Sequence, residues 1–312
     1  MTAGELRAIA VPGMGAEDVL VLTSGPDAGA VVTGTEDGSI WRIRDDGRRI
    51  DRIAGTGGRP LGIEELSDGL LLVCDATLGL LRVDPATGEV ETLLDSIDGR
   101  PLLVTNNAAV AADGTIYFSD SSTVHRVEDW KKDFVEDTRT GRLLRLDPDG
   151  TVTVLEDGLA FANGVALAAD ESFVAVAESG AGTVVRHWLT GPRAGTRDFL
   201  VPDLPGYPDN ISRGTDGLLW VTIASPRTAV IEGVLRSPLC LRRAVSRLPA
   251  RLQPAPARTV RVQAYDDAGR LVRDVNLDTP DFHMVTGVRE HHGRLWLGSL
   301  EEPAVAVVDL TG

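Results

Sequence analysis

Short apolar runs, each ended by a tight polar turn, recur along the whole chain. The clearest set comprises Leu61 to Leu66, Leu70 to Cys74, Gly79 to Val83 and Val90 to Leu94. The turns between them contain Gly, Asp and Pro, which supply the positive or fixed φ that tight turns need. A period of 3.6 residues fits none of these runs, so the pattern predicts four consecutive β-strands.

This four-strand unit repeats along the sequence. The first turn of each unit falls at Gly25, Gly69, Gly114, Glu171, Gly217 and Gly293. The underlying spacing is roughly 45 residues, which is the size of one four-stranded propeller blade. We therefore predict an all-β protein, a six-bladed β-propeller with four-stranded blades that forms a single domain over residues 1–312.

The two ends of the chain are predicted to meet. The last blade offers Thr286 to Glu290, Leu295 to Leu300 and Ala304 to Leu310, and is then one strand short. The segment from Glu5 to Val11 can supply the missing outer strand. Because this pairing removes an exposed sheet edge, we expect the N-terminal strand to close the last blade.

One segment longer than the repeat, residues 124–139, lies in blade three. It contains the charged and aromatic run HRVEDWKKDFVEDTR. Loops on a rigid scaffold often carry binding residues, so we expect this one to contact substrate. A solvated surface excursion is the alternative.

A second insertion, residues 227–258, lies in blade five. A short helix is predicted there, ended by Pro249. Its apolar face comprises Leu239, Leu241, Ala244, Val245 and Leu248, and its basic face comprises Arg242, Arg243 and Arg247. We expect a short helical lid over the channel mouth; contact with an anionic membrane surface or with another subunit is the alternative.

Oxygen-bearing side chains recur at one register of the repeat. Counting back eight residues from each turn gives Glu17, Leu61, Asn106, Asn163, Asp209 and Val285. The innermost strands of a propeller surround its axis, so residues at equal register form a ring at one mouth of the channel. Carboxylate and amide oxygens suit Ca²⁺, whereas zinc favours His and Cys.

The ring therefore predicts one calcium ion at the mouth of the axial channel. The alternative is that these side chains hydrogen-bond one another without a metal. In that case Glu17 and Asp209 would face each other as buried like charges, which repel.

Composition narrows the classes of partner. The net charge of −15 argues against a nucleic-acid partner and is compatible with cation binding or simple acidic solubility. The chain has two cysteines and an N-terminus without signal-peptide character, so we expect a cytoplasmic protein. No run approaches the roughly 20 apolar residues of a membrane span. We expect a small-molecule substrate, and the sequence leaves the oligomeric state open.

Two residues are candidates for acid–base chemistry at this mouth. Asp209 is the first candidate for base or nucleophile, and His283, two residues before Val285, is the second. Trp130 in the first insertion and Phe282 near the ring suggest a partly hydrophobic pocket. Such a pocket favours a substrate larger and less polar than a sugar lactone.

Three runs give the chain a family likeness: FANGVAL at 161–167, HWLTGP at 187–192 and LPGYPDNI at 204–211. They resemble the strictosidine synthase-like proteins. That family belongs with gluconolactonases, paraoxonases and diisopropyl fluorophosphatase in a superfamily of six-bladed, calcium-dependent propellers. The likeness extends from about Gly13 to Leu310.

The resemblance implies roles for the same ring residues. Calcium-ligating motifs of the hydrolases are matched by the Glu of GAE at 15–17 and by Asn163, and the usual set is completed by Asn106 and Asp209. Asn210, beside Asp209, matches an Asp-Asn pair of paraoxonase-like members and is implied as an extra ligand.

The chain departs from the family pattern at two positions of the expected substrate site. Asn107 stands where hydrolytic relatives often have Asp. Thr286 stands where strictosidine synthase proper has its catalytic Glu, which disfavours an amine and aldehyde condensation by that route.

These features together predict a calcium-dependent hydrolase of a lactone or ester. The metal would polarise the carbonyl while Asp209 or His283 activates water. A bond-forming or cyclising enzyme of specialised metabolism and a non-catalytic binding propeller are the alternatives, because family membership does not choose the reaction.

Overall fold

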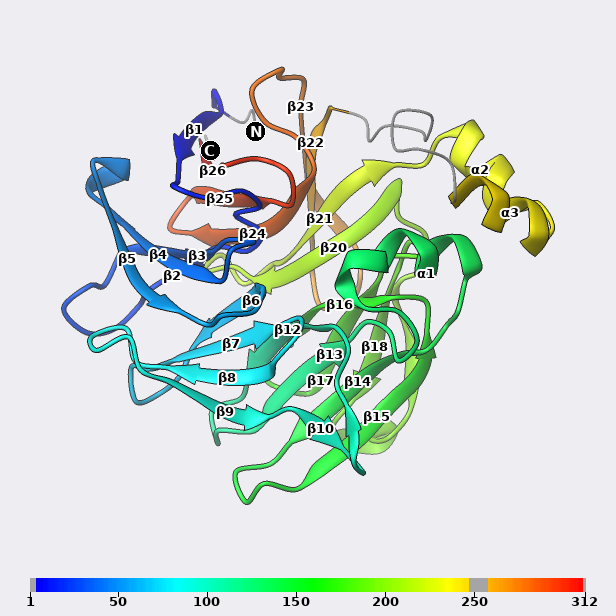
Figure 1. Cartoon of the computed structure of the whole chain (residues 1–312), viewed down its shortest axis with the longest axis horizontal. Helices are drawn as coiled ribbons and strands as arrows, with labels where there is room; N and C mark the ends of the chain where they lie inside the picture. Colours follow the sequence, from blue (N-terminus) through cyan, green and yellow to red (C-terminus); the bar gives the residue numbers. More distant parts are fainter. Residues whose placement is uncertain (1–3, 247–257, 311–312) are drawn as a thin grey trace.

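A computed structural model describes residues 4–246 and 258–310. The described residues form six four-stranded antiparallel sheets that follow one another around a central axis in chain order (Figure 1). The prediction of a six-bladed propeller is confirmed.

Each blade begins with its innermost strand. Blade one comprises β2 (Leu20–Val21), β3 (Val31–Gly34), β4 (Ser39–Arg44) and β5 (Arg49–Gly55). Blade two comprises β6 (Pro60–Glu65), β7 (Leu71–Asp75), β8 (Gly79–Val83) and β9 (Val90–Leu94). Blade three comprises β12 (Thr105–Val110), β13 (Ile116–Asp120), β14 (Gly141–Leu146) and β15 (Val152–Leu159).

The second half repeats this order. Blade four comprises β16 (Ala162–Leu167), β17 (Phe173–Glu178), β18 (Thr183–Trp188) and β19 (Arg197–Val201). Blade five comprises β20 (Gly206–Arg213), β21 (Leu219–Pro226), β22 (Val260–Tyr265) and β23 (Leu271–Leu277). Blade six comprises β24 (Val285–His291), β25 (Arg294–Ser299), β26 (Ala304–Asp309) and β1 (Arg7–Ala10).

The N-terminal strand closes the last blade, as predicted. β1 pairs antiparallel with β26 from Arg7 opposite Val307 to Ala10 opposite Ala304. Ile9 is the buried residue of β1, and it joins Val305 and Val307 in an apolar cluster with blade one. The first and last strands therefore lie side by side and complete the ring.

The core lies between the blades. In the part of the chain that the structure describes, an apolar cluster fills each of the six interfaces between neighbouring sheets. Successive residues of a strand point to opposite faces, and both faces of an inner strand are covered by neighbours. This explains why strands near the axis are buried along their whole length, as in β7, the second strand of blade two, in which every residue is buried.

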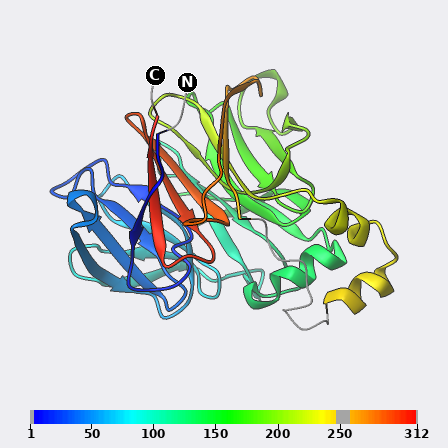
Figure 2. The same ribbon diagram turned by 90° about the horizontal axis from the view of Figure 1, so that it is seen from above.

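Short elements complete the described chain. A small hairpin, β10 (Ser96–Ile97) with β11 (Arg100–Pro101), follows blade two, and 3-10 turns occur at η1 (Asp45–Gly47), η2 (Val127–Asp129) and η3 (Gly191–Arg193). The insertion in blade three contains α1 (Trp130–Glu136), and the insertion in blade five contains α2 (Ala229–Leu235) and α3 (Leu239–Ser246). The three helices gather on one side of the propeller (Figure 2).

A helical insertion in blade five was predicted, but only part of its predicted apolar face packs against the protein. Leu239 and Leu241 are exposed, so the predicted apolar face does not pack as a whole; Val245 is the member that lines the cavity described below. Arg247, Leu248 and Pro249 lie outside the described residues. In blade three the sequence predicted a loop, and α1 is an additional helix.

Candidate metal and substrate site

A β-bulge positions the ring of residues around the axis. In blades two to six, two residues of the inner strand lie opposite one residue of the second strand. The first residue of each bulged pair is Leu61, Asn106, Asn163, Asp209 or Thr286. Because a bulge bends its strand and re-aims a side chain, it marks the ring position independently of turn counting.

The bulge corrects the predicted ring in blade six. The equivalent of Asn106 and Asp209 there is Thr286, not Val285. The hairpin between β24 and β25 has two turn residues, His292 and Gly293, between the paired His291 and Arg294. Counting from its glycine therefore moves the register by one residue. Val285 is fully buried in the core between blades five and six.

Two residues that directly follow ring residues, Asp18 and Asn107, connect neighbouring blades. Asp18 accepts a hydrogen bond at Oδ2 from the backbone N–H of Ile63 (3.0 Å), and Asn107 accepts one at Oδ1 from that of Val165 (2.8 Å). Asn107 is buried and does not line the cavity, so its predicted substrate contact is corrected to a contact between blades three and four.

Glycines occupy the same position in the alternate blades. A Cβ on Gly62 would lie 2.8 Å from the Asn107 Cα, and one on Gly287 would lie 2.7 Å from the Asp18 Cα. Gly164 lies as closely against Asn210. In each of these three contacts between neighbouring inner strands, one residue must be glycine. The absence of a side chain lets the inner strands approach closely around the axis.

Four oxygens of the ring are buried without a hydrogen-bond donor among the described residues. They are Glu17 Oε2, Asn106 Oδ1, Asn163 Oδ1 and Asp209 Oδ1. All four residues line the same cavity. A buried polar atom without a partner is costly and calls for an unseen ligand. Sequence counting found these four residues, and the structure brings them together.

Asn210 differs from its counterparts Asp18 and Asn107. Neither its Oδ1 nor its Nδ2 has a hydrogen-bond partner in the described part of the chain. Asn210 directly follows the ring residue Asp209 on β20 and is buried. Unlike Asn107, Asn210 thus has free polar atoms beside the ring, which suits the extra ligand that the sequence predicted.

The two carboxyl groups of the ring hold protons strongly when no cation is present. Burial, followed by the charges of Asp209 and Asp18, raises the pKa of Glu17 well above its usual range. Burial likewise raises the pKa of Asp209 to about 8. Removing water penalises the charged form, and a neighbouring like charge adds to the penalty.

This donor set fits calcium. Two carboxylates balance the charge of the ion, two amide oxygens are hard donors, and water or substrate can complete six to eight ligands. The described residues contain no cluster of three or more His, Cys, Asp or Glu suited to a metal. A site that relies on amide oxygens therefore favours a hard cation over a transition metal.

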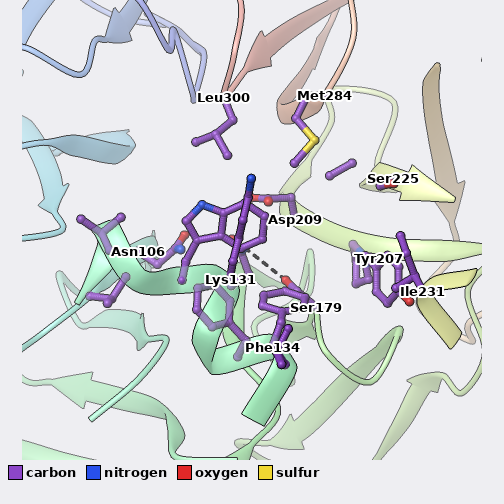
Figure 3. A pocket seen from close by; sticks show the side chains of 18 of the residues that line it. Asn106, Lys131, Phe134, Ser179, Tyr207, Asp209, Ser225, Ile231, Met284 and Leu300 are labelled. Atoms are coloured by element: carbon purple, nitrogen blue, oxygen red, sulfur yellow. Dashed lines mark hydrogen bonds between the residues drawn. The ribbon is translucent and has the colours of Figure 1, made fainter. Parts of the chain in front are cut away.

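A cavity of about 220 Å³ extends from the ring to the inserted helices. Its walls are mainly apolar, and four aromatic residues, Trp130, Phe134, Phe161 and Tyr207, contribute to them (Figure 3). Phe134 packs at 4.9 Å from Phe161 and at 6.3 Å from Tyr207 between ring centroids. Trp130, the aromatic residue that the sequence singled out in the first insertion, therefore lines this cavity.

Hydrogen bonds hold the lid in place. Asp133 of α1 accepts from Ser122 and Thr138, and the Tyr207 hydroxyl donates to Glu232 of α2 at 3.0 Å. Arg243 of α3 donates to both carboxylate oxygens of Glu136 on α1, at 2.9 and 3.3 Å. The three helices are therefore tied to the blades and to one another above the cavity.

The structure places three other predicted site residues outside the cavity wall. His283 is held between Glu301 and Glu302 by its two ring nitrogens. Phe282 is fully buried in the core between blades five and six. Thr286 donates its hydroxyl hydrogen to the backbone oxygen of Glu17 at 2.8 Å, so it supports a ring residue.

Sequence reasoning missed several residues of the cavity. Phe134, Phe161, Tyr207 and Lys131 line it. Phe161 and Met284 adopt positive φ values of 60° and 50°, two residues before Asn163 and Thr286. Gly15, with φ of 65°, has the same place before Glu17. Left-handed backbone is uncommon for such side chains and occurs often at binding sites.

Known proteins resemble the chain over most of its length. A family model for strictosidine synthase matches residues 106–192. The Arabidopsis thaliana protein STRICTOSIDINE SYNTHASE-LIKE 10 is 35% identical over 81% of this chain and 70% of its own length. The chain belongs to the strictosidine synthase-like family. The adipocyte plasma membrane-associated protein of Salmo salar is a further relative, 34% identical over 95% of this chain and 77% of its own length.

Solved structures share the fold of this strictosidine synthase-like chain. A gluconolactonase from Xanthomonas campestris superposes with a TM-score of 0.70 and 18% identity over 99% of this chain and 90% of its own. The calcium-binding protein regucalcin from Agrobacterium tumefaciens gives 0.67 and 13% over 99% and 94%.

The described helices are short, and both cysteines are free thiols. Among the described residues, no helix is long and apolar enough to cross a bilayer. Cys74 is a free, buried thiol and Cys240 a free, exposed one. The cytoplasmic setting stays a prediction.

Proposed function

We propose that this propeller is a calcium-dependent hydrolase of apolar esters or lactones. The observation that carries the proposal is the set of four donor-free oxygens, on Glu17, Asn106, Asn163 and Asp209, at one end of a mainly apolar cavity. The shared fold with a gluconolactonase and with a calcium-binding protein agrees with it.

These four residues would hold the ion, and Asn210 would supply a further ligand. When bound, calcium supplies a Lewis acid that polarises a carbonyl and stabilises the negative charge developing on its oxygen. The wall of Trp130, Phe134, Phe161 and Tyr207 excludes water and orients the apolar part of the substrate.

Asp209 is the base of the proposed reaction. Its Oδ1 has no donor and the residue lines the cavity, so it can take a proton from an attacking water. His283 is not proposed as a base because its two ring nitrogens contact Glu301 and Glu302 away from the cavity. Thr286 lacks an acid–base group, which disfavours a condensation that needs a Glu at this position.

Hydrolysis of a panel of aryl esters and lactones tests the proposal. The purified protein is assayed with calcium, with a chelator and as the Asp209→Asn variant. We expect calcium-dependent turnover that falls by about 100-fold or more in Asp209→Asn, because a general base contributes about 10² to 10⁴. Asp170→Asn is the matched control, since Asp170 is an exposed turn residue that accepts from the Ser172 N–H.

Titration calorimetry with calcium separates the metal from the reaction. Glu17→Gln and Asp209→Asn should each weaken binding, while Asp170→Asn should not. Calcium binding without turnover of any ester or lactone would favour a bond-forming enzyme or a binding propeller and would reject the hydrolase.

A further inference from the structure

The cavity carries one basic group on an otherwise apolar and acidic wall. Among the lining residues that the structure describes, Lys131 is the one cation, and Glu17 and Asp209 are the anions. Lys131 lies on α1, and its side chain extends over the pocket (Figure 3). A basic residue here is not required by the fold of the blades, because α1 belongs to the insertion.

The neighbourhood of Lys131 combines a charge with an aromatic surface. Its Nζ lies 5.4 Å from the centroid of the Trp130 ring, and both residues line the cavity. Trp130 in turn packs edge-on against Phe134, with 5.5 Å between the ring centroids. A ligand whose apolar part packs on this aromatic wall therefore has the Lys131 ammonium group beside it, at the edge of the wall.

Lys131 is not the counter-ion of the acidic ring. Among the described residues no ion pair joins Lys131 to Glu17 or Asp209, and the nearby Arg59 pairs with Glu36 at 3.1 Å. The next residue, Lys132, forms an ion pair with Asp129 at 2.6 Å and does not line the cavity. Two adjacent lysines on one helix thus have different surroundings, and only Lys131 faces the ligand space.

From this arrangement we propose that Lys131 selects substrates that carry an anionic group, such as a carboxylate, on an apolar body. The scissile carbonyl would lie at the oxygen ring, the apolar part against Trp130 and Phe134, and the anion at the Lys131 ammonium. The inference rests on the proposed function in one respect, namely that the molecule bound in the cavity is the substrate. Its recognition chemistry is a charge-assisted hydrogen bond beside a desolvated wall.

Binding of a matched pair of ligands tests the role of Lys131 without any turnover. The probes are phenylbutyrate and phenylbutanol, which share a carbon skeleton and differ in the anionic group. We expect the wild-type protein to bind phenylbutyrate about tenfold or more tightly than the alcohol. Lys131→Met should remove this preference and leave the affinity for phenylbutanol within about twofold.

Lys132→Met is the matched control, because it removes a neighbouring charge of the same helix that does not reach the cavity. This variant should keep the preference for phenylbutyrate. Equal affinities of the wild-type protein for the two probes would overturn the inference, as would a preference that survives in Lys131→Met.

A calcium arm distinguishes Lys131 from the metal as the carboxylate receptor. The same titrations are run in a chelator, where a preference due to Lys131 persists and a preference due to a bound ion disappears. Loss of the preference in chelator, with no effect of Lys131→Met, would overturn the inference.

The ester assay separates this inference from the hydrolase proposal. A Lys131-dependent preference without ester or lactone turnover supports the anion contact and rejects the hydrolase. If neutral esters are hydrolysed and the matching esters with an added carboxylate have no lower KM, the result supports the hydrolase and rejects the anion contact.

Discussion

At the scale of the residue, two neighbours on an inner strand can have different tasks. Asn106 faces the cavity with a donor-free oxygen, whereas Asn107 bonds the next blade. The same division separates Glu17 from Asp18 in blade one. A one-residue difference in register therefore decides between a side chain that faces the cavity and one that contacts the next blade.

The acidic pair leads to a prediction on pH. The folded-state pKa of Asp209 lies above its usual value, so its contribution to stability without calcium is present below about pH 4 and is lost as the pH rises through about 8. Calcium must displace these protons, so its affinity should increase over the same interval. Calorimetry in two buffers of different ionisation enthalpy, at about pH 6 and about pH 8, measures both the affinity and the protons released.

A calcium affinity that is constant across this interval, with no proton release, would contradict the prediction. Glu17→Gln should release fewer protons on binding than the wild-type protein, because one of the two carboxyl groups is absent.

Asn107 provides a second prediction at this scale. Asn107→Ala leaves the buried Val165 N–H without its acceptor, which should cost about 1–3 kcal/mol of unfolding free energy. Urea unfolding at saturating calcium measures this loss, and KM for the best ester should change by less than about twofold. Asn107→Asp keeps an acceptor and should recover most of the stability; a large increase in KM with unchanged stability would restore the substrate-binding role.

At the scale of the element, the three helices form a lid whose parts come from different blades. Arg243 on α3 and Glu136 on α1 connect the two insertions through two hydrogen bonds. The Tyr207–Glu232 hydrogen bond connects α2 to the inner strand of blade five. The cavity is therefore closed by contacts between segments far apart in the sequence.

Weakening this connection should affect binding more than chemistry. Glu136→Ala removes the acceptor of Arg243, and an ion pair near the surface contributes little, so we expect KM for apolar esters to rise by about two- to fivefold with a smaller change in kcat. Steady-state kinetics measures both constants. Glu128→Ala, an exposed residue of η2, is the control; an equal effect in both variants would argue against the connection between α1 and α3.

The elements that the sequence predicted well are those with a local signal. β8 and β9 match their predicted bounds because Gly79, Gly88 and the apolar runs mark both ends. The six predicted turn residues all have positive φ, including Glu171 at 54°. Counting back from the turns found four ring residues, because in their blades the ring position and the first turn are separated by the same number of residues. These are Glu17, Asn106, Asn163 and Asp209.

The misses depend on information that a single stretch of sequence does not contain. The ring position of blade six was assigned to Val285 instead of Thr286, because the His292-Gly293 turn is one residue shorter than the turns of blades two, three and five. Phe282 and His283 lie near the ring in sequence, but neither lines the cavity. Phe282 packs in the core between blades five and six, and His283 contacts Glu301 and Glu302, which follow β25. Phe161 and Tyr207 form an aromatic wall with Phe134, which belongs to the insertion of another blade.

At the scale of the whole molecule, the ring is closed by one strand from the start of the chain. The single buried side chain of β1 is that of Ile9, whereas Arg7 on the same strand is exposed. The edge that β1 covers is β26, whose sequence AVAVVD is mostly buried. An uncovered apolar edge of this kind pairs with other chains.

Closure of the ring predicts unequal effects of two substitutions on β1. Ile9→Ala should lower the free energy of unfolding by about 2–4 kcal/mol, because it removes a buried branched side chain at the closing contact. Arg7→Ala should cost less than about 1 kcal/mol, since its ion pair with Asp46 is exposed. Urea unfolding of both variants measures these losses. Equal losses of unfolding free energy would indicate that packing of β1 does not stabilise the closed ring.

The separate origins of the oxygen ring and the lid have a consequence for how such a protein can diversify. The ring residues belong to inner strands, where a bulge and tight glycine contacts fix them, and few substitutions are tolerated. The lid belongs to two insertions that can change in length and side chains without disturbing the blades. A lineage can therefore change the molecules it accepts by altering the insertions while it keeps the same oxygen ring. Grafting the insertions between relatives should then transfer selectivity alone.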